Sequence, residues 1–232
     1  LGHAAPVQGT PMRRIVEGLH RFQTDGFPTK RDLFHKLAES QNPRALFITC
    51  GDSRIVPDLI MQTSPGEIFI CRNAGNIVPP FGEVAGGVSA TIEYAVVALE
   101  IPNIIVCGHS DCGAMKGILY PHTTSTMPMV AHWLRHAEPA RYVVEELHRE
   151  KSEEEKLEIL TRENILAQLT NLTTHPAVAA RLARGTLRIY GWHYDISTGD
   201  VMNFDAERNE FVHLEPAERL PSATPRPRHD VG

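Results

Sequence analysis

The chain has 232 residues, of which 42% are hydrophobic and 22% charged; this is ordinary globular usage and allows one domain with a sizeable core. A formal net charge of −5, without a dense patch of Lys and Arg, argues against nucleic-acid binding. No apolar run reaches the length of a membrane-spanning helix, so we expect no membrane partner.

The two ends of the chain differ in composition from its middle. Residues 1–11 lack the apolar stretch of a signal peptide, and the tail from Pro221 is rich in Pro and Arg. We therefore expect a disordered arm or vector remnant at 1–11, a single domain at 12–220, and a disordered tail at 221–232. Four cysteines without a secretory signal predict free thiols or metal ligands in a cytoplasmic protein.

The first half of the chain predicts two helices followed by alternating strands and helices. Apolar residues recur at i, i+4 and i+7 from 12 to 24, which is the pattern of an amphipathic helix. A second short helix is expected at 30–39. Short apolar runs predict buried strands at 45–48, 67–71 and 103–107. The segment 87–100 is apolar nearly all round, so we expect a helix that is buried on several sides and contacts another subunit.

The second half predicts further helices and a terminal hairpin. We expect Pro139 to break one helical stretch, Ser152 and Glu155 to form a capping box, and Gly185 to end the last helix. The expected helices lie at 127–146, 152–169 and 175–184, and the hairpin strands at 187–194 and 201–204. Strands that alternate with helices predict an α/β fold, with a central, mostly parallel sheet flanked by helices.

Two of the predicted strands run into residues that can bind a metal. Cys50 follows the strand at 45–48, and His109 and Cys112 follow the strand at 103–107. Because the carboxyl ends of parallel strands meet at one edge of a sheet, these side chains can converge. Two cysteines and one histidine leave the fourth position of a tetrahedral zinc ion open, which is a catalytic arrangement.

Each of these residues also has a purely structural explanation. An isolated H-x-x-C pattern is a weak indication of a metal site, because a buried Cys is usually a small hydrophobic residue. By spacing alone, Cys107 competes as a ligand, since it shares a strand face with His109. Cys71 lies inside an apolar run and is expected in the core. Asp52 and Arg54 could form a structural ion pair at a turn.

Taken together, the motifs resemble those of the β-class carbonic anhydrases. Cys-Gly-Asp-Ser-Arg at 50–54 and Gly-His-Ser-Asp-Cys-Gly-Ala at 108–114 are similar to the two signatures of that family, and the stretches 72–76 and 92–95 follow its order. The resemblance runs from about Met12 to Phe211. Within the family, the motifs resemble most those of the plant-like bacterial subgroup, which includes the enzyme associated with cyanate metabolism. It implies a zinc lyase that reversibly hydrates carbon dioxide to bicarbonate and a proton, by attack of zinc-bound hydroxide.

The resemblance also implies the roles of individual residues. Cys50, His109 and Cys112 would bind one zinc ion per chain, and Cys107 would not be a ligand. Asp52 would orient the attacking group while Arg54 clamps it, as a catalytic dyad. The substrate-binding residues would be Gln41 (across a dimer interface), Phe69, Ala74 and Tyr94 (an apolar wall), and Gly113 (a backbone group). The N-terminal helices would pack on the partner subunit of a homodimer, which could be part of a homotetramer.

A second subgroup of the family adds an expectation about the fourth metal position. In that subgroup the dyad aspartate can bind zinc, while bicarbonate occupies a pocket with a tryptophan three residues before the first ligand. Phe47 stands at this position and lacks an indole N–H, although Arg72 and Tyr194 resemble other members of the pocket. We therefore expect Asp52 to stay paired with Arg54.

Two other functions remain open from the sequence. A carbon disulfide or carbonyl sulfide hydrolase resembles this family in fold and zinc site, and only substrate assays separate the two activities. A zinc-stabilised binding module without catalysis belongs to a different class. Asp52, Arg54 and an open fourth metal position argue against such a module.

Overall fold

The computed structural model describes residues 11–83, 86–214 and 223, and it divides the chain into two compact units, Leu1–Gln41 and Asn42–Gly232. The predicted arm at 1–11 lies outside the described residues except for Pro11, which begins the first helix. The predicted tail at 221–232 lies outside them except for Ala223. Within the described part of the chain, no helix has the length and apolar character needed to cross a membrane.

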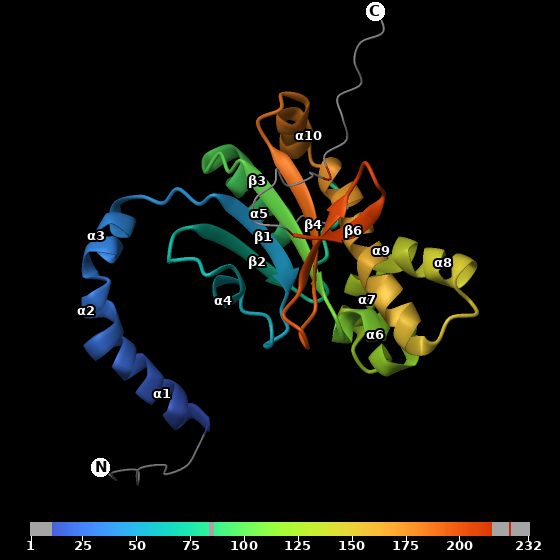
Figure 1. Ribbon diagram of the computed structural model, residues 1–232, viewed down its shortest axis with the longest axis horizontal. Coiled ribbons are helices and arrows are strands. Elements are labelled where there is room, and N and C mark those ends of the chain that lie inside the picture. Colours follow the sequence, from blue (N-terminus) through green and yellow to red (C-terminus); the bar gives the residue numbers. More distant parts are fainter. Residues whose placement is uncertain (1–10, 84–85, 215–222, 224–232) are drawn as a thin grey trace, which may run out of the picture. The chain divides into compact units, whose positions relative to one another are not determined.

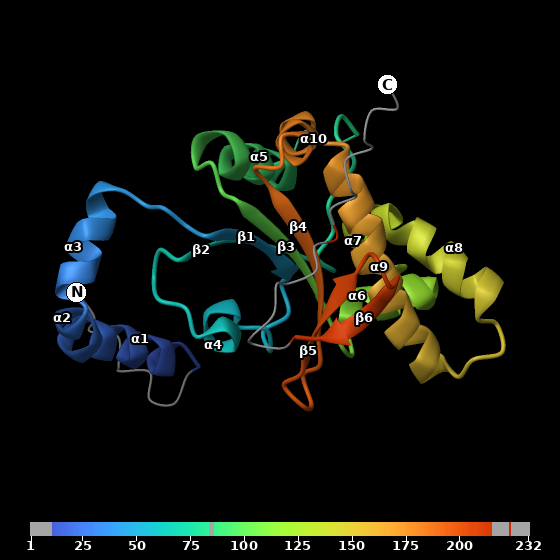
Figure 2. The same cartoon turned by 45° about the horizontal axis from the view of Figure 1, so that its top comes forward.

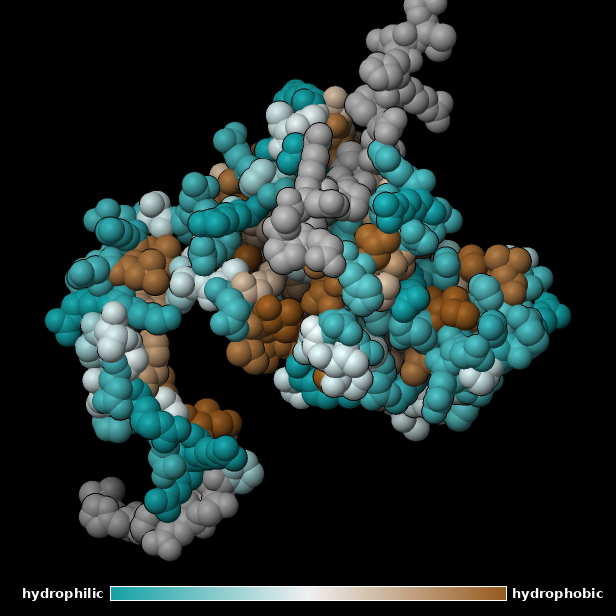
Figure 3. All heavy atoms as spheres, in the orientation of Figure 1, coloured by the Kyte–Doolittle hydropathy of each residue, from teal (hydrophilic) through white to brown (hydrophobic). Residues whose placement is uncertain are grey.

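The N-terminal unit is helical, as predicted. Its elements are α1 (Pro11–Arg21), a π-helical turn η1 (Phe22–Gly26), α2 (Phe27–Thr29) and α3 (Arg31–Glu39). No residue of these elements is buried, and Ile15 and Leu19 are 62% and 56% exposed. Figure 3 shows brown, apolar side chains at the surface of this unit. The apolar stripe that makes α1 amphipathic is therefore exposed within the described residues of this unit.

A six-stranded sheet of described residues forms the centre of the C-terminal unit (Figure 1), in the order β2-β1-β3-β4-β5-β6. The first four strands are parallel to one another, and β5 and β6 are antiparallel. The strands are β1 (Ala45–Cys50), β2 (Ile68–Asn73), β3 (Asn103–His109), β4 (Arg188–Tyr194), β5 (Val201–Asp205) and β6 (Glu210–His213). The predicted α/β fold with a mostly parallel sheet is confirmed. The sequence did not predict β6, a strand of four residues with only two apolar side chains.

Helices flank both faces of the sheet (Figures 1 and 2). Those described are α4 (Pro57–Met61), α5 (Gly87–Glu93) with its π-helical turn η2 (Tyr94–Ala98), α6 (Gly113–Leu119), η3 (Pro121–Thr124), α7 (Pro128–Leu134), η4 (Arg135–Ala137), α8 (Glu138–Leu147), α9 (Glu153–Thr173) and α10 (Pro176–Ala183). The capping box of Ser152 and Glu155 starts α9 as predicted. The helix runs about one turn beyond residue 169 because Leu172 is buried against the sheet.

The core occupies both faces of the sheet. Leu46, Ile48, Ile104 and Val106 pack beneath α5, α9 and α10, and Phe47, Ile105 and Tyr190 form a smaller cluster on the opposite face. A third cluster lies beneath α6, α7, α8 and α9 and includes Cys50, Cys112, Met115 and Leu160. The cysteines of the predicted metal site are therefore held within packed helices, beside the carboxyl ends of the strands.

The helix predicted at 87–100 differs from expectation in its burial. Ile92, Ala95 and Val96 are buried against the sheet, but Tyr94 and Val97 are 51% and 61% exposed. Although the sequence of this helix is apolar nearly all round, other described residues cover only one of its sides. The expectation of burial on several sides is therefore wrong for the single chain.

Candidate metal centre

The candidate site lies where the order of the strands changes direction. From β1 the chain places β2 on one side and β3 on the other, so a crevice opens between the carboxyl ends of β1 and β3. Strand β1 ends at Cys50, and β3 ends at His109. A short turn then carries Cys112 to the N-cap of α6. The topology thus delivers all three side chains to one crevice.

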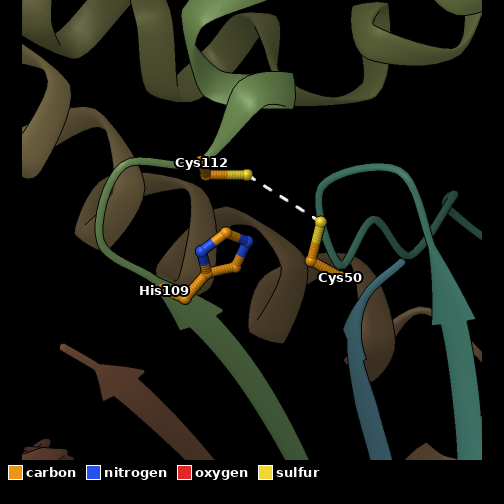
Figure 4. Close-up of side chains that lie close together, drawn as sticks. All are labelled: Cys50, His109 and Cys112. Carbon is orange, nitrogen blue, oxygen red and sulfur yellow. Dashed lines mark hydrogen bonds between the residues drawn. The ribbon is translucent and has the colours of Figure 1, made fainter. Parts of the chain in front are cut away.

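The side chains of Cys50, His109 and Cys112 converge in this crevice (Figure 4). The two Sγ atoms are 4.0 Å apart, and all three potential ligand atoms lie within 4.8 Å of one another. A tetrahedral zinc ion with Zn–S bonds of about 2.3 Å separates two sulfur ligands by about 3.8 Å. The geometry therefore fits such an ion after only a small contraction.

The imidazole of His109 has the tautomer and the free nitrogen that a metal needs. Its Nδ1 lies 2.9 Å from the Ser110 carbonyl oxygen and donates to it, so Nε2 carries the lone pair. Nε2 is buried and has no hydrogen-bond partner among the described residues. A buried nitrogen without a partner costs free energy, and a metal ion bound at this position would offset that cost.

The two thiols of the site form a coupled pair. The hydrogen bond from Cys112, aided by backbone groups, lowers the pKa of Cys50 to about 4. Donating that hydrogen bond, together with burial, raises the pKa of Cys112. Without a metal the site therefore holds one thiolate, and a bound ion would displace the second proton.

The other two cysteines lie in the core and away from this cluster. Cys107 packs with Phe47 on one face of the sheet, and burial raises its pKa to about 12. Burial also raises the pKa of Cys71, which packs on the other face. The structure thus separates Cys107 from the cluster, an alternative that spacing alone left open.

Asp52 and Arg54 form a bidentate pair beside the cluster. Arg54 donates from Nε to Asp52 Oδ1 at 3.0 Å and from Nη2 to Oδ2 at 2.8 Å. These hydrogen bonds hold the pKa of Asp52 well below its usual range. Asp52 Oδ2 lies 4.0 Å from His109 Nε2. An ionised acceptor is therefore fixed next to the position where a metal would sit, and it is paired with Arg54 as expected.

Two charged residues that the sequence reading did not assign complete this arrangement. Asp111, in the turn between His109 and Cys112, accepts from Arg54 Nη1 at 2.9 Å and forms an ion pair with Lys116. Its backbone adopts the left-handed conformation, with φ of 57°. The signal available in the sequence was a charged residue between two candidate ligands. Because Arg54 binds both Asp52 and Asp111, it connects the loops that follow β1 and β3.

The structure brings only part of the predicted substrate site together. Ala74 and Gly113 line a cavity of about 670 Å³ that also borders Cys50. Phe69 and Tyr94 contact each other, with ring centroids 6.0 Å apart. However, Phe69 pairs with Leu46 and Asn73 pairs with Cys50. Phe69 is therefore about 13 Å along the strand from the cluster.

The residues of the expected apolar wall thus lie at two separate places within one chain. Ala74 lies at the cavity beside the metal cluster, whereas the Phe69–Tyr94 pair lies near the other end of the strands. Gln41 is exposed and is the last residue of the N-terminal unit. The role of Gln41 across a subunit interface stays a prediction.

Comparisons with known proteins agree on one family. The sequence model described as Carbonic anhydrase matches residues 45–201. The carbonic anhydrase of Pseudomonas aeruginosa is 50% identical over 203 residues, which covers 88% of this chain and 92% of the relative. The structure of the β-carbonic anhydrase CcaA matches with a TM-score of 0.87 and 46% identity, over 90% of this chain and 94% of the other. A tetrameric β-carbonic anhydrase from Sordaria macrospora matches with a TM-score of 0.75 and 30% identity, over 83% and 95%.

Proposed function

The chain belongs to the β-class carbonic anhydrases, and from this premise we propose that it reversibly hydrates carbon dioxide at a zinc ion held by Cys50, His109 and Cys112. The observation that carries the zinc assignment is the buried Nε2 of His109, which has no partner among the described residues and lies beside two thiols. A soft cation that accepts nitrogen and sulfur ligands satisfies all three side chains.

The surrounding residues have roles that suit this reaction. When bound by Cys50, His109 and Cys112, zinc would supply the acidity that lowers the pKa of water toward neutrality. Asp52, kept ionised by Arg54, accepts a hydrogen bond from the nucleophile, which directs the nucleophile's lone pair at carbon dioxide. Ala74 presents a small apolar surface, which suits an uncharged linear substrate. The Gln41 amide donates to the carboxylate oxygen that develops in the transition state.

We further propose that a second copy of the chain completes the site, in a homodimer or homotetramer. The Phe69–Tyr94 pair is not part of the cavity beside Cys50, and the family resemblance gives Gln41 a role across a dimer interface; a partner subunit would supply these residues. The exposed apolar side chains of Ile15, Leu19 and Val97 offer surfaces for such a partner. The tetrameric assembly of the Sordaria macrospora relative supports this proposal.

The cysteines support a reducing compartment. All four are free thiols, and each lies within the described residues. Because disulfides are rare in the cytosol and zinc thiolates persist there, we propose a cytoplasmic location. Labelling the thiols in freshly lysed cells tests this proposal, since oxidised cysteines would contradict it.

Stopped-flow hydration of carbon dioxide tests the function directly. We expect the zinc-loaded protein to be active and the chelated protein to be inactive. Because two thiolates cancel the formal charge of zinc, activity should rise toward alkaline pH. Hydrolysis of carbon disulfide or carbonyl sulfide without hydration of carbon dioxide would favour the alternative enzyme. No activity on any of these substrates would favour a binding module.

A further inference from the structure

We propose that Asp111 is a positioning residue for the metal centre, which acts through Arg54 to keep the carboxylate of Asp52 off the metal ion. The inference rests on the proposed function, because it concerns the fourth coordination position of the proposed zinc ion. Asp111 lies between His109 and Cys112 in the chain, but it is not one of the three clustered ligands.

Asp111 contacts Arg54 with both its side chain and its backbone. Nη1 of Arg54 donates to Asp111 Oδ2 at 2.9 Å, and Nη2 donates to the Asp111 carbonyl oxygen at 3.1 Å. The other side of the guanidinium, with Nε and Nη2, donates to the two carboxylate oxygens of Asp52. Because a guanidinium is planar and rigid, fixing one of its sides also fixes the direction of the other.

The turn that carries Asp111 is itself held in place. The backbone of Asp111 is left-handed, with φ of 57°, a conformation that Asp adopts more readily than most residues. Ser110 joins the turn to the end of β4, since its backbone N–H donates to the Tyr194 carbonyl oxygen at 2.9 Å. Lys116, in α6, forms an ion pair with Oδ1, the second carboxylate oxygen of Asp111. Arg54 is therefore anchored to the turn that delivers the metal ligands.

Asp52 needs a restraint because it lies close to a ligating position. Its Oδ2 is 4.0 Å from Nε2 of His109. Two ligands of a tetrahedral zinc ion, with bonds of about 2.0 Å, lie about 3.3 Å apart, so the difference is less than about 1 Å. Oδ1 accepts from the backbone N–H of Arg54 at 2.9 Å, and the carboxylate can turn about this bond and bring Oδ2 to the metal.

The grip of Arg54 on Asp52 depends on its second anchor. An isolated exposed ion pair contributes little, whereas a network with bidentate geometry holds its members in place. The side chains of Arg54 and Asp111 are exposed, and Asp111 accepts two of the four hydrogen bonds that the guanidinium donates to described residues. Without the Asp111 carboxylate, Arg54 is free to turn toward water, and Asp52 is free to bind the metal ion. Asp111 thus keeps the fourth position open for water.

Two substitutions of Asp111 test this inference, and both tolerate the left-handed backbone. Asp111→Gly removes the carboxylate and leaves the turn unstrained. Asp111→Asn keeps the size of the side chain, but its single amide oxygen cannot pair with both Arg54 and Lys116. Glu67→Gln is the matched control, because it neutralises a carboxylate that pairs with the exposed Arg44.

The affinity of the cobalt-substituted protein for imidazole, measured by absorption titration, reports whether the fourth position is open. At about pH 8 imidazole is uncharged, so loss of the Asp111 charge has little direct effect on its binding. We expect its apparent dissociation constant to rise about tenfold or more in both Asp111 variants, which corresponds to Asp52 on the metal in about nine-tenths of the molecules. Glu67→Gln should keep the wild-type value.

A double variant shows whether the effect passes through Asp52. Asp52→Asn, added to Asp111→Gly, should restore the wild-type affinity for imidazole, because a neutral amide is not among the common zinc ligands. Damage to the turn alone would not be repaired by a change at Asp52. Metal analysis and urea unfolding establish that each variant is loaded and folded, and Asp111→Asn serves if Asp111→Gly is not folded.

Wild-type imidazole affinity in the loaded Asp111 variants would overturn the inference, and so would failure of the double variant to recover. Loss of metal from both single variants would also overturn it, because Asp111 would then support the ligands themselves. The proposed function fails in a different way, in which the wild-type protein itself does not bind one metal ion per chain. Hydration activity is not needed for either comparison.

Discussion

Arg54 grips the carboxylate of Asp52 with two parallel hydrogen bonds, from Nε at 3.0 Å and from Nη2 at 2.8 Å, and reaches Asp111 with Nη1 at 2.9 Å. A planar guanidinium makes these contacts at once, which a lysine ammonium cannot do. The loops after β1 and β3 are thereby joined across the crevice that holds His109 and the two thiols. The Arg54 side chain thus adds two hydrogen bonds to the one that its own backbone N–H donates to Asp52 Oδ1 at 2.9 Å.

Replacing Arg54 should therefore impair catalysis. We expect Arg54→Lys to lower kcat/KM for carbon dioxide hydration by about tenfold or more, because Asp52 loses its bidentate partner. Arg44→Lys is the control, since Arg44 pairs with Glu67 at the surface. Stopped-flow kinetics at several pH values measure the effect. An Arg54→Lys enzyme with unchanged kcat/KM would contradict the role given to this pair.

The ligand assignment predicts a contrast among the cysteines. Cys50→Ser and Cys112→Ser should lose stoichiometric zinc, while Cys107→Ser should keep about one zinc ion per chain, since Cys107 lies in the core beside Phe47. Elemental analysis of the purified variants gives the stoichiometry. X-ray absorption should show Zn–S distances near 2.3 Å and Zn–N near 2.0–2.1 Å. Retention of zinc by Cys112→Ser, or its loss from folded Cys107→Ser, would refute the assignment.

Metal removal should leave the protein folded and inactive. The core beneath α5, α9 and α10 does not involve the metal cluster, so circular dichroism should change little after chelation. Iodoacetamide at neutral pH should then modify Cys50, whose pKa is lowered to about 4, and leave Cys107, whose pKa is raised to about 12. Mass spectrometry of peptides locates the modification. Unfolding on chelation would instead indicate a structural zinc.

Assembly should be required for activity. We expect light scattering to show two or four chains, because Ile15 and Leu19 on α1 are exposed apolar residues. Leu19→Glu should reduce the mass and also the hydration rate, since a separated chain lacks the Phe69–Tyr94 pair near its cavity. Glu17→Gln, on the same helix, should change neither quantity. An active monomer would exclude a shared site.

The environment of Glu158 predicts how the unfolding free energy of the protein falls at acid pH. Its Oε2 lies 3.4 Å from Nε2 of the buried His193, and this imidazole, with Arg162, lowers the pKa of Glu158 below its ordinary value of 4.5. A carboxyl with a lowered pKa contributes stability that is present above 4.5 and is lost as the pH falls through the lowered value.

In the metal-free protein, the unfolding free energy of Glu158→Gln should therefore fall less steeply below pH 4.5 than that of the wild type. Urea titrations over this range measure the slope. Glu154→Gln, an exposed residue of the same helix, is the control. A wild-type slope in Glu158→Gln would show that the contact with His193 does not persist in solution.

Local sequence patterns were sufficient to predict several strands, the start of one helix and the family of this protein. Apolar runs such as 45–48 and 103–107 predicted the parallel strands, because strands covered on both faces have few polar positions. Ser152 and Glu155 predicted the start of α9, because a capping box needs only residues three apart. The motifs around Cys50 and His109 indicated the family, because each signature lies within a few consecutive residues.

The tertiary structure decided what depends on distant segments. It separated Cys107 from the metal cluster, left half of the helix at 87–100 exposed, and placed Phe69 away from Cys50 through the strand register. It also brought Asn164 to Gly75 across 89 positions of sequence. A sequence periodicity reports which side of an element is apolar, whereas register, burial and long-range hydrogen bonds arise only when the elements pack together.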